Sequence, residues 1–302
     1  MRLYKLQIEE DFEIKNHTSF KIGGKIKRIC FPETVDEFTD LLEKYPNSFV
    51  AGSWSDTLVS TFGYSGTVIS TSRLNKFKAD DNIITAQAGV KGPKLAQFAA
   101  EEGLSGLEFM IGFPGSVGGE VFMNAGAHGQ CVADCLKSAK VYDGKSVIDL
   151  TNSDMKFEYR KSICQDKGYI VLEARFELKK CDTEAIKQRM AENLDFRRLH
   201  QPSLALPNCG SIFKNPENNS AGKLLDECEV KSLNFGSARV WENHANFIVN
   251  DGCAKSDDVL SLMYEMKKRV WDKFGIELEP EIRFLGGENE KEVELCKYLK
   301  VK

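Results

Sequence analysis

Residues 207–216, which read PNCGSIFKNP, hold a serine whose surroundings suggest chemistry. Ser211 follows a glycine and precedes an apolar pair, and a lysine and an asparagine lie just beyond it. A serine nucleophile of an α/β hydrolase stands in a G-x-S-x-G turn, and Ser211 lacks that pattern. A nucleophile is therefore unsupported, and a role of Ser211 in a turn or cap stays open from these residues alone.

Glycine is unusually dense in residues 106–129, GLEFMIGFPGSVGGEVFMNAGAHG. Without Cβ atoms, backbone N–H groups can approach an anion closely, and entry into a helix adds the positive end of its dipole. Gly115–Gly119 therefore suits a pyrophosphate, although it is not G-x-G-x-x-G and a tight packing loop is the alternative. Two further Gly/Ser loops, Ile22–Gly24 and Gly52–Asp56, favour one extended ligand that carries phosphates.

Two charged residues could act on such a ligand. Arg160, in YRKS, could pair with a carboxylate or phosphate through its forked guanidinium, and the alternative is a solvated surface arginine. Glu281, in LEPEI, has apolar neighbours that could bury its carboxyl. Burial is costly unless the carboxyl is paired or protonated, and the alternative is a strand-edge glutamate that faces water.

Composition excludes several classes of function. The chain has 302 residues, 42% hydrophobic and 28% charged, which is ordinary for a soluble globular protein. A net charge of −4 gives no sign of nucleic-acid binding, and no apolar run approaches the roughly 20 residues of a membrane helix. Acidic residues occupy positions 9, 10, 11 and 13, where a signal peptide would be apolar. We expect a cytoplasmic protein with neither a nucleic-acid nor a membrane partner.

The cysteine pattern argues against a metal site. None of the nine cysteines forms C-x-x-C. Cys131 and Cys135 are four apart, but no histidine lies at ligand spacing, and the four histidines of the chain are far from one another. We expect reduced, mostly buried thiols and no metal.

Helices and strands alternate irregularly, which predicts an α+β fold. The pattern predicts helices at 34–45, 92–103, 182–199, 221–228 and 256–274. It predicts strands at 48–52, 67–70, 82–89, 168–178 and 245–250, and a hairpin that turns at Asp143-Gly144. A loop rich in Pro, Asn and Ser follows residue 200, so we expect at least two unequal units with a boundary there.

Several segments, in order along residues 16–286, resemble the UDP-N-acetylenolpyruvoylglucosamine reductase family. They are NHTSFKIGG, the glycine-rich block, YRKS, PNCGSIFKNP, AGKLLDE, HANFIVN and LEPEIRFLG. The absence of an insertion between YRKS and GSIFKNP resembles the shorter second type of this enzyme. The resemblance implies an FAD-binding unit at 1–195, similar to PCMH and vanillyl-alcohol-oxidase domains. This unit would have two α+β subdomains, 1–70 and 71–195, and an α+β substrate-binding domain would follow at 196–302.

The resemblance also implies an activity, that of UDP-N-acetylmuramate dehydrogenase. NADPH would pass a hydride to non-covalent FAD, whose N5 passes it to the double bond of UDP-N-acetylglucosamine enolpyruvate. A proton added at the neighbouring carbon would complete UDP-N-acetylmuramate, a precursor of cell-wall peptidoglycan. We expect a monomer.

The family motifs imply roles for individual residues. Ser211 would be the acid that protonates the enolate-like intermediate, and Arg160 and Glu281 would stabilise that intermediate. Tyr159, Lys214 and Asn215 would bind the substrate. The implied FAD-binding residues are Gly52, Ser53, Ser55, Asp56, Gly112, Pro114, Gly115, Ser116, Gly118, Gly119, Asn124 and Gly126.

One loop departs from the family pattern. Gly52–Asp56 reads GSWSD, where the family usually has glycines and an asparagine. Trp54 places a large side chain, and Asp56 a negative charge, where phosphates are expected. Two alternatives therefore stay open: a degenerate, FAD-poor nucleotide-sugar-binding protein, and another flavin oxidase of the same fold.

Overall fold

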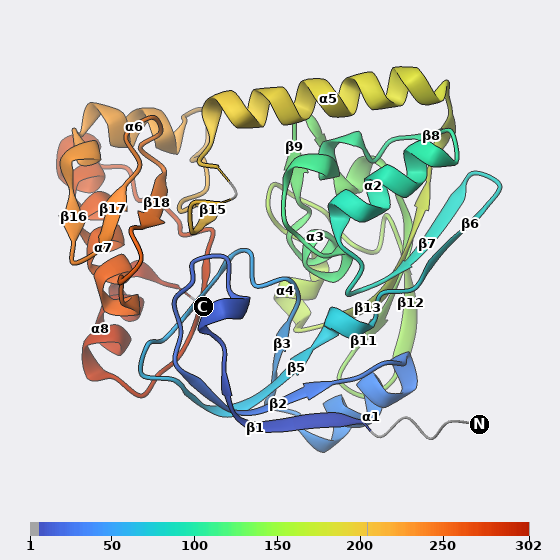
Figure 1. Cartoon of the computed structure of the whole chain (residues 1–302), viewed down its shortest axis with the longest axis horizontal. Coiled ribbons are helices and arrows are strands. Elements are labelled where there is room, and N and C mark those ends of the chain that lie inside the picture. Colours follow the sequence, from blue (N-terminus) through green and yellow to red (C-terminus); the bar gives the residue numbers. More distant parts are fainter. Residues whose placement is uncertain (1–5, 204, 302) are drawn as a thin grey trace. The chain divides into compact units, whose positions relative to one another are not determined.

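The computed structural model describes residues 6–203 and 205–301 and divides them into two compact units (Figure 1). Unit 1 comprises the described residues up to Glu9, Ile29–Ser53 and Thr67–Arg197. Unit 2 comprises Glu10–Arg28, Trp54–Gly66 and the described residues from Arg198 onward. The predicted division at 195/196, with its two N-terminal subdomains, stays a prediction. The units differ from it in that two N-terminal segments group with the C-terminal part.

The larger sheet of unit 1 has the strand order β12-β11-β13-β7-β6 and is antiparallel throughout. Its strands are β6 (Phe77–Asp80), β7 (Ile83–Gln87), β11 (Leu136–Tyr142), β12 (Val147–Thr151) and β13 (Ile170–Glu177). The predicted hairpin joins β11 to β12: Gly144 has a φ of +97°, and Asp143 Oδ1 accepts from the N–H groups of Lys145 and Ser146. That prediction is confirmed.

Four helices contribute buried residues to the core of unit 1. They are α2 (Gly92–Glu101), α3 (Val117–Met123), α4 (Ile163–Lys167) and α5 (Thr183–His200), the last of which crosses the unit border. As predicted, α2 has Pro93 in its first turn, and Gly103 follows its end with a φ of +66°. The shared core includes Leu95 and Ala99 of α2, Val117 and Val121 of α3, and Ala86 and Ala174 of the sheet.

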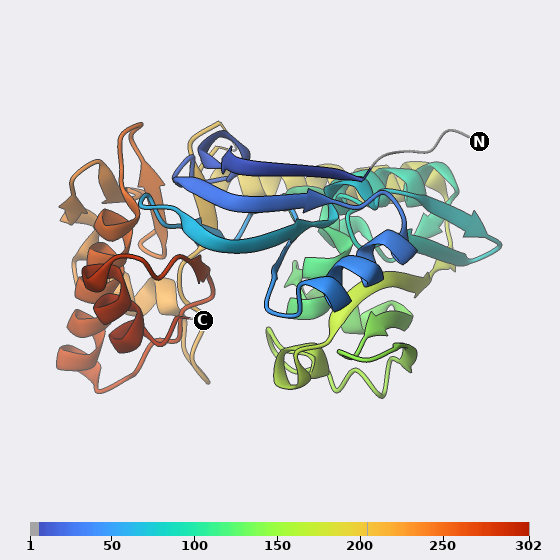
Figure 2. The ribbon, with the colours of Figure 1, turned by 90° about the horizontal axis from the view of Figure 1, so that it is seen from below.

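A four-stranded sheet has the order β1-β2-β5-β3, in which β3 and β5 are parallel. Its strands are β1 (Gln7–Glu13), β2 (Lys25–Phe31), β3 (Phe49–Ala51) and β5 (Tyr64–Ser70). Helix α1 (Val35–Lys44) begins as predicted, because Thr34 Oγ1 accepts from the N–H of Glu37 at 3.1 Å. Figure 2 shows α1 along one face of these strands, where Phe38 packs with Cys30 and Ile69.

Unit 2 contains the antiparallel sheet β15-β18-β17-β16. Its strands are β15 (Asn208–Ser211), β16 (Asn234–Phe235), β17 (Ala238–Val240) and β18 (Phe247–Asn250), and its helices are α6 (Ala221–Glu227), α7 (Ser256–Phe274) and α8 (Glu290–Leu299). A separate parallel pair joins β4 (Thr57–Val59) to β19 (Arg283–Leu285). As predicted, α7 ends at Gly275, whose φ is +65°. Helix α8 is not among the helices that the sequence pattern predicts.

Short elements complete the described chain. They are η1 (Lys15–His17), η2 (Thr71–Arg73), η3 (Glu108–Gly112), η4 (Val132–Asp134), η5 (Val230–Ser232), β8 (Leu104–Ser105), β9 (Gly126–Ala127), β10 (Gln130–Cys131) and β14 (Lys179–Lys180). All nine cysteines are free thiols. In the part of the chain that the structure describes, no helix is both long and apolar enough to span a membrane.

A buried carboxyl group fixes α8 in unit 2. Glu292 is fully buried and accepts hydrogen bonds from the hydroxyls of Ser60, at 2.7 Å, and Ser256. We expect Glu292→Ala to lower the free energy of unfolding by about 2–4 kcal/mol, because two buried hydroxyls lose their acceptor. Denaturant unfolding monitored by circular dichroism measures this change.

The matched control is Glu294→Ala, since Glu294 lies on the same helix but is exposed. It should change the free energy of unfolding by less than about 0.5 kcal/mol. Equal stability of the two variants would contradict the role given to Glu292.

Candidate active site

Ser211 ends strand β15 in unit 2 and is half-buried. It pairs with Phe247 of β18 across a register irregularity, and Gly210 before it has a φ of +80°, which favours glycine. The next residue, Ile212, donates its N–H to the carbonyl of Asn246 at 2.9 Å. The backbone that carries the Ser211 hydroxyl is therefore held by a hydrogen bond at the next residue, Ile212.

Asn246 holds this backbone through its side chain as well. It is 3% exposed, and its carboxamide accepts from the N–H of Phe213 at 3.0 Å and donates to the carbonyl of the same residue at 2.8 Å. The sequence analysis missed Asn246, because nothing in HANFIVN shows which strand its side chain meets.

Glu281 lies beside the same segment. Its N–H donates to the carbonyl of Ile212 at 2.8 Å, and Phe213 forms an isolated antiparallel bridge with Pro280. Burial raises the pKa of the Cys209 thiol, with a smaller contribution from the charges of Asp56 and Glu281. The backbone of Glu281 therefore lies beside the segment that carries Ser211, within unit 2.

Lys214 and Asn215 follow on this segment. The Lys214 ammonium forms an ion pair with Glu279 at 2.6 Å, and its N–H donates to the Glu279 carbonyl at 2.9 Å. Asn215 Oδ1 accepts from the N–H of Ala221, the first residue of α6, at 2.9 Å. Contacts with Glu279 and Ala221 therefore orient Lys214 and Asn215, respectively.

The unusual loop Gly52–Asp56 is divided by the unit border, and Trp54, Ser55 and Asp56 belong to unit 2. Trp54 adopts a φ of +57°, yet its side chain is packed into the protein with 7% exposure. Burial raises the pKa of Asp56, and the charge of Arg283 lowers it. The backbones of these two residues also meet, since the N–H of Arg283 donates to the Asp56 carbonyl at 2.8 Å. The charge of Asp56 is therefore partly balanced by Arg283.

Arg160 belongs to unit 1 and stands in a tight turn closed by hydrogen bonds between Glu158 and Lys161. Its φ of +54° is unusual for a side chain of this size. Its Nη2 donates to the Gly126 carbonyl at 3.1 Å, and the guanidinium lies 5.3 Å from the ring centre of Tyr159. The predicted residues Tyr159, Arg160 and Gly126 therefore lie together.

Asn124 supports that turn. It ends α3 with a φ of +45° and is 6% exposed. Its carboxamide donates to the Glu158 carbonyl at 2.9 Å and accepts from the N–H of Ala133 at 3.0 Å. In the structure, Asn124 thus positions the turn that carries Arg160.

The glycine-rich loop is packed more tightly than the prediction of a phosphate-binding loop implies. The N–H groups of Val117 and Gly118 donate to the carbonyls of Val90 and Ala88 at 2.9 and 2.8 Å. These two amides are therefore already hydrogen-bonded within the protein. Gly119 is exposed. Among the other predicted residues, Gly112 is buried, Gly115 is half-buried and Pro114 is exposed.

Three segments of unit 1 converge at this loop. Lys91 forms an antiparallel bridge with Ser116, and its Nζ donates to Ser53 Oγ at 2.7 Å. A Cβ atom at Gly52 would overlap Ser116 Oγ, so a larger residue there would displace this hydroxyl. The sequence does not predict a role for Lys91, since a lysine just before a helix carries no signal of its own.

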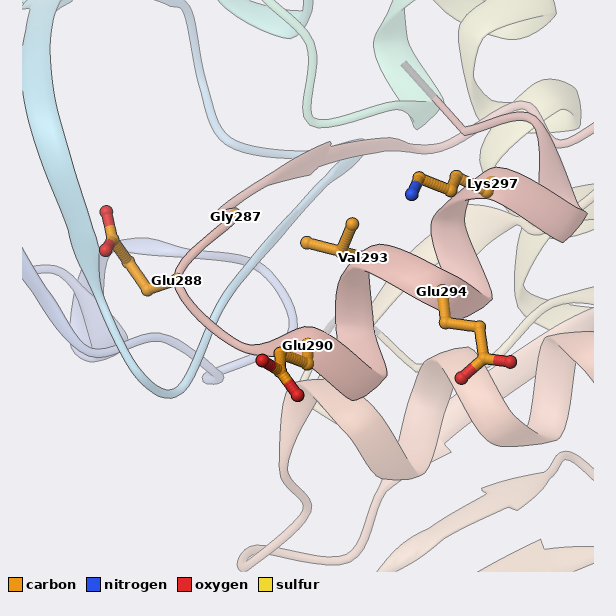
Figure 3. Close-up of a pocket in the computed structure, with 6 residues that line it drawn as sticks. All are labelled: Gly287, Glu288, Glu290, Val293, Glu294 and Lys297. Carbon is orange, nitrogen blue, oxygen red and sulfur yellow. The ribbon is translucent and has the colours of Figure 1, made fainter.

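A shallow pocket on unit 2 lies elsewhere. Figure 3 shows Val293 and Lys297 of α8 pointing toward it and the Glu288 carboxylate pointing away. None of its lining residues is a predicted site residue. In residues 6–203 and 205–301, no group of three His, Cys, Asp or Glu side chains is arranged to hold a metal ion.

Comparisons with known proteins place the chain in a family. A family model described as UDP-N-acetylenolpyruvoylglucosamine reductase, C-terminal domain, matches residues 201–285, and an FAD binding domain matches residues 26–151. A protein of Caldicellulosiruptor bescii named UDP-N-acetylenolpyruvoylglucosamine reductase is 41% identical over 93% of this chain and 91% of its own length. One of Clostridium novyi with the same name is 38% identical over 95% of each chain.

A solved structure is also similar. The crystal structure of UDP-N-acetylenolpyruvylglucosamine reductase from Thermus caldophilus has a TM-score of 0.79 and 34% sequence identity. The match covers 93% of this chain and 99% of that chain.

Proposed function

Because the chain belongs to the UDP-N-acetylenolpyruvoylglucosamine reductase family, we propose that it reduces UDP-N-acetylglucosamine enolpyruvate to UDP-N-acetylmuramate through the residues described above. It is an FAD-dependent oxidoreductase of peptidoglycan precursor synthesis. The geometric observation that supports the residue roles best is the pairing of the Ser211 segment with Glu281, through the 2.8 Å bond from the Glu281 N–H to the Ile212 carbonyl.

The residues of unit 1 fit an FAD phosphate group. Gly52 leaves room for the Ser116 hydroxyl, and the Lys91 ammonium and the Ser53 hydroxyl stand at the same place. These groups can neutralise and hydrogen-bond a pyrophosphate. Bound FAD supplies hydride transfer, with NADPH as the reductant. The other predicted FAD-binding residues remain part of this proposal: Ser55, Asp56, Gly112, Pro114, Gly115, Gly118, Gly119, Asn124 and Gly126.

Ser211 donates the proton. When a hydride adds to one carbon of the enolpyruvyl double bond, the electron pair of that bond moves to the neighbouring carbon and its carboxylate. The Ser211 Oγ–H then gives its proton to that carbon and leaves an alkoxide that solvent reprotonates. A serine hydroxyl is a weak acid, but a carbanion conjugated to a carboxylate is basic enough to take its proton.

Arg160 and Glu281 stabilise the charge that develops. The Arg160 guanidinium pairs with the substrate carboxylate, and the fixed turn around it limits the reorganisation needed. Glu281 acts as a hydrogen-bond donor to the same carboxylate, which requires that its carboxyl takes up a proton when the substrate binds. Tyr159, Lys214 and Asn215 bind the nucleotide-sugar. We further infer a monomer that works in the cytoplasm without nucleic-acid or membrane partners.

The visible absorption spectrum tests this function. Under anaerobic conditions we expect the purified full chain to show a flavin spectrum that bleaches on addition of NADPH. The enolpyruvyl substrate should then restore the oxidised colour, while UDP-N-acetylglucosamine, which lacks the double bond, should not. A protein that stays colourless with added FAD would contradict the proposal and favour a nucleotide-sugar-binding protein. Oxygen consumption with a simple sugar and no NADPH would favour another flavin oxidase.

A further inference from the structure

Glu120, on α3, is a buried acid that the proposed mechanism does not use. It is 3% exposed, and neither carboxyl oxygen has a hydrogen-bond partner among the described residues. An ionised carboxylate without a partner is strongly disfavoured inside a protein, so this group must either be neutral or have a partner that binds from outside.

The glutamate lies where the segments of the FAD site converge. A Cβ atom at either Gly92 or Gly115 would overlap Glu120 Oε1, so the carboxyl occupies the space that these two glycines leave. The N–H of Gly92 also donates to the Gly115 carbonyl, at 3.3 Å. The side chain therefore sits between the start of α2 and the glycine-rich loop, next to Lys91.

The ionisable groups near Glu120 supply too little positive charge to balance an ionised Glu120 carboxylate. Burial raises the pKa of Glu120 to about 8, and the charge of Lys91 opposes this shift only in part. Burial also raises the pKa of the Cys135 thiol, on which the charge of Glu120 acts, and raises that of Cys164 on α4 to about 11. The sheet strand against α3 contributes apolar Ala174 to this core. At neutral pH Glu120 is therefore mainly protonated.

We propose that Lys91 is a phosphate-binding residue of the cofactor site, and that Glu120 is a positioning residue whose protonated carboxyl leaves the Lys91 ammonium available to the pyrophosphate. The inference rests on the proposed FAD site, in which Lys91 already stands, and adds Glu120 to it. Lys91 is exposed and already contacts Ser53, so an anion can reach it. An ionised Glu120 would compete for the same ammonium and would repel the phosphates.

The proposal predicts weaker FAD binding at alkaline pH. The protonated form of Glu120 binds FAD, and the ionised form, which grows as pH rises through about 8, does not. If only the protonated form binds, Kd rises about eightfold between pH 7.5 and pH 9. Loss of the Lys91 proton acts in the same direction, since burial lowers the pKa of Lys91 while Glu120 raises it. Variants must therefore separate the two groups.

The test measures Kd for FAD on the flavin-free full chain, by flavin fluorescence, from pH 6.5 to pH 9. Glu120→Gln mimics the protonated form, so its Kd should be close to that of the wild type at pH 7 and should stay flat to pH 9. Lys91→Met should raise Kd by about tenfold or more at pH 7.5, because a charge-assisted hydrogen bond is lost. Glu101→Gln and Lys94→Met, exposed substitutions on α2, are the matched controls.

Thermal unfolding of the flavin-free protein gives a second readout. The folded state holds the Glu120 proton up to pH about 8, whereas the unfolded chain releases it near the ordinary value of 4.5. The contribution of this group to stability is complete below the unfolded pKa and is lost as pH rises toward 8. The Tm of the wild type should therefore fall more between pH 5 and pH 8 than that of Glu120→Gln.

Three results would overturn the inference. If Kd and Tm of Glu120→Gln depend on pH as they do in the wild type, Glu120 has no role in the site. If the Kd of Lys91→Met equals that of Lys94→Met, Lys91 does not bind the phosphates. A wild-type chain that binds no FAD at pH 7 would overturn the cofactor site itself, and with it the inference. The last result differs from the first two, so failure of the proposed function is distinguishable from failure of the inference.

Discussion

In the Ser211→Ala variant, we expect kcat for reduction of UDP-N-acetylglucosamine enolpyruvate to fall by about 100- to 10,000-fold, the range for loss of a positioned general acid. The bleaching of flavin absorbance by NADPH should persist, because Ser211 has no part in it. The two half-reactions can be followed separately by stopped-flow absorbance, which assigns the loss to the step that involves the enolpyruvyl substrate.

Ser232→Ala is the control, since Ser232 is exposed in the same unit and its hydroxyl contacts only a local carbonyl in the part of the chain that the structure describes. It should leave kcat within about twofold, as surface substitutions away from a site have small effects. Turnover of Ser211→Ala at the rate of Ser232→Ala would show that another group donates the proton, and Ser211 would then be a turn residue only.

We expect Asn246→Ala to lower both stability and turnover. The N–H and carbonyl of Phe213 each lose their partner in a buried place, which costs about 2–5 kcal/mol of the free energy of unfolding. Since Ser211 lies two residues before Phe213, its hydroxyl should also move. A misplacement of about 1 Å lowers a rate by roughly 100-fold. Denaturant unfolding and steady-state kinetics, on material shown to be folded, measure the two losses.

The matched control is Asn234→Ala, because Asn234 is exposed on β16 of the same sheet. It should be neutral in both measurements. If Asn246→Ala loses stability but keeps the wild-type kcat, the side chain of Asn246 holds the strand without positioning Ser211, and the proposed link to catalysis is wrong.

Local signals in the sequence predict many of the elements. Thr34 and Glu37 have the spacing of a helix start, and the structure places the N-terminus of α1 there. Asp143-Gly144 predicts the β11–β12 hairpin, and Gly275 predicts the end of α7. In each case the deciding contacts lie within a few residues, so the pattern of side chains and glycines is sufficient.

Long-range contacts decide what the pattern does not predict. Helix α8 buries a charged residue, Glu292, which is held by Ser60 and Ser256, far away in sequence. The roles given to Lys91, Glu120 and Asn246 depend on contacts with residues that only the folded chain brings close. The family motifs do predict Ser211 and Glu281 as members of one site, and unit 2 places their backbones side by side.

The parallel pair β4–β19 has a consequence for the order in which the protein is made. Thr57–Val59 is synthesised first, and its partner Arg283–Leu285 follows more than 220 residues later. At typical rates of translation, this strand waits about 10–45 s for its hydrogen-bond partner. Three buried residues of β4 stay uncovered in the meantime. Unit 2 therefore closes only after residues 283–285 have been made, and until then the nascent chain exposes an apolar strand edge that chaperones can recognise.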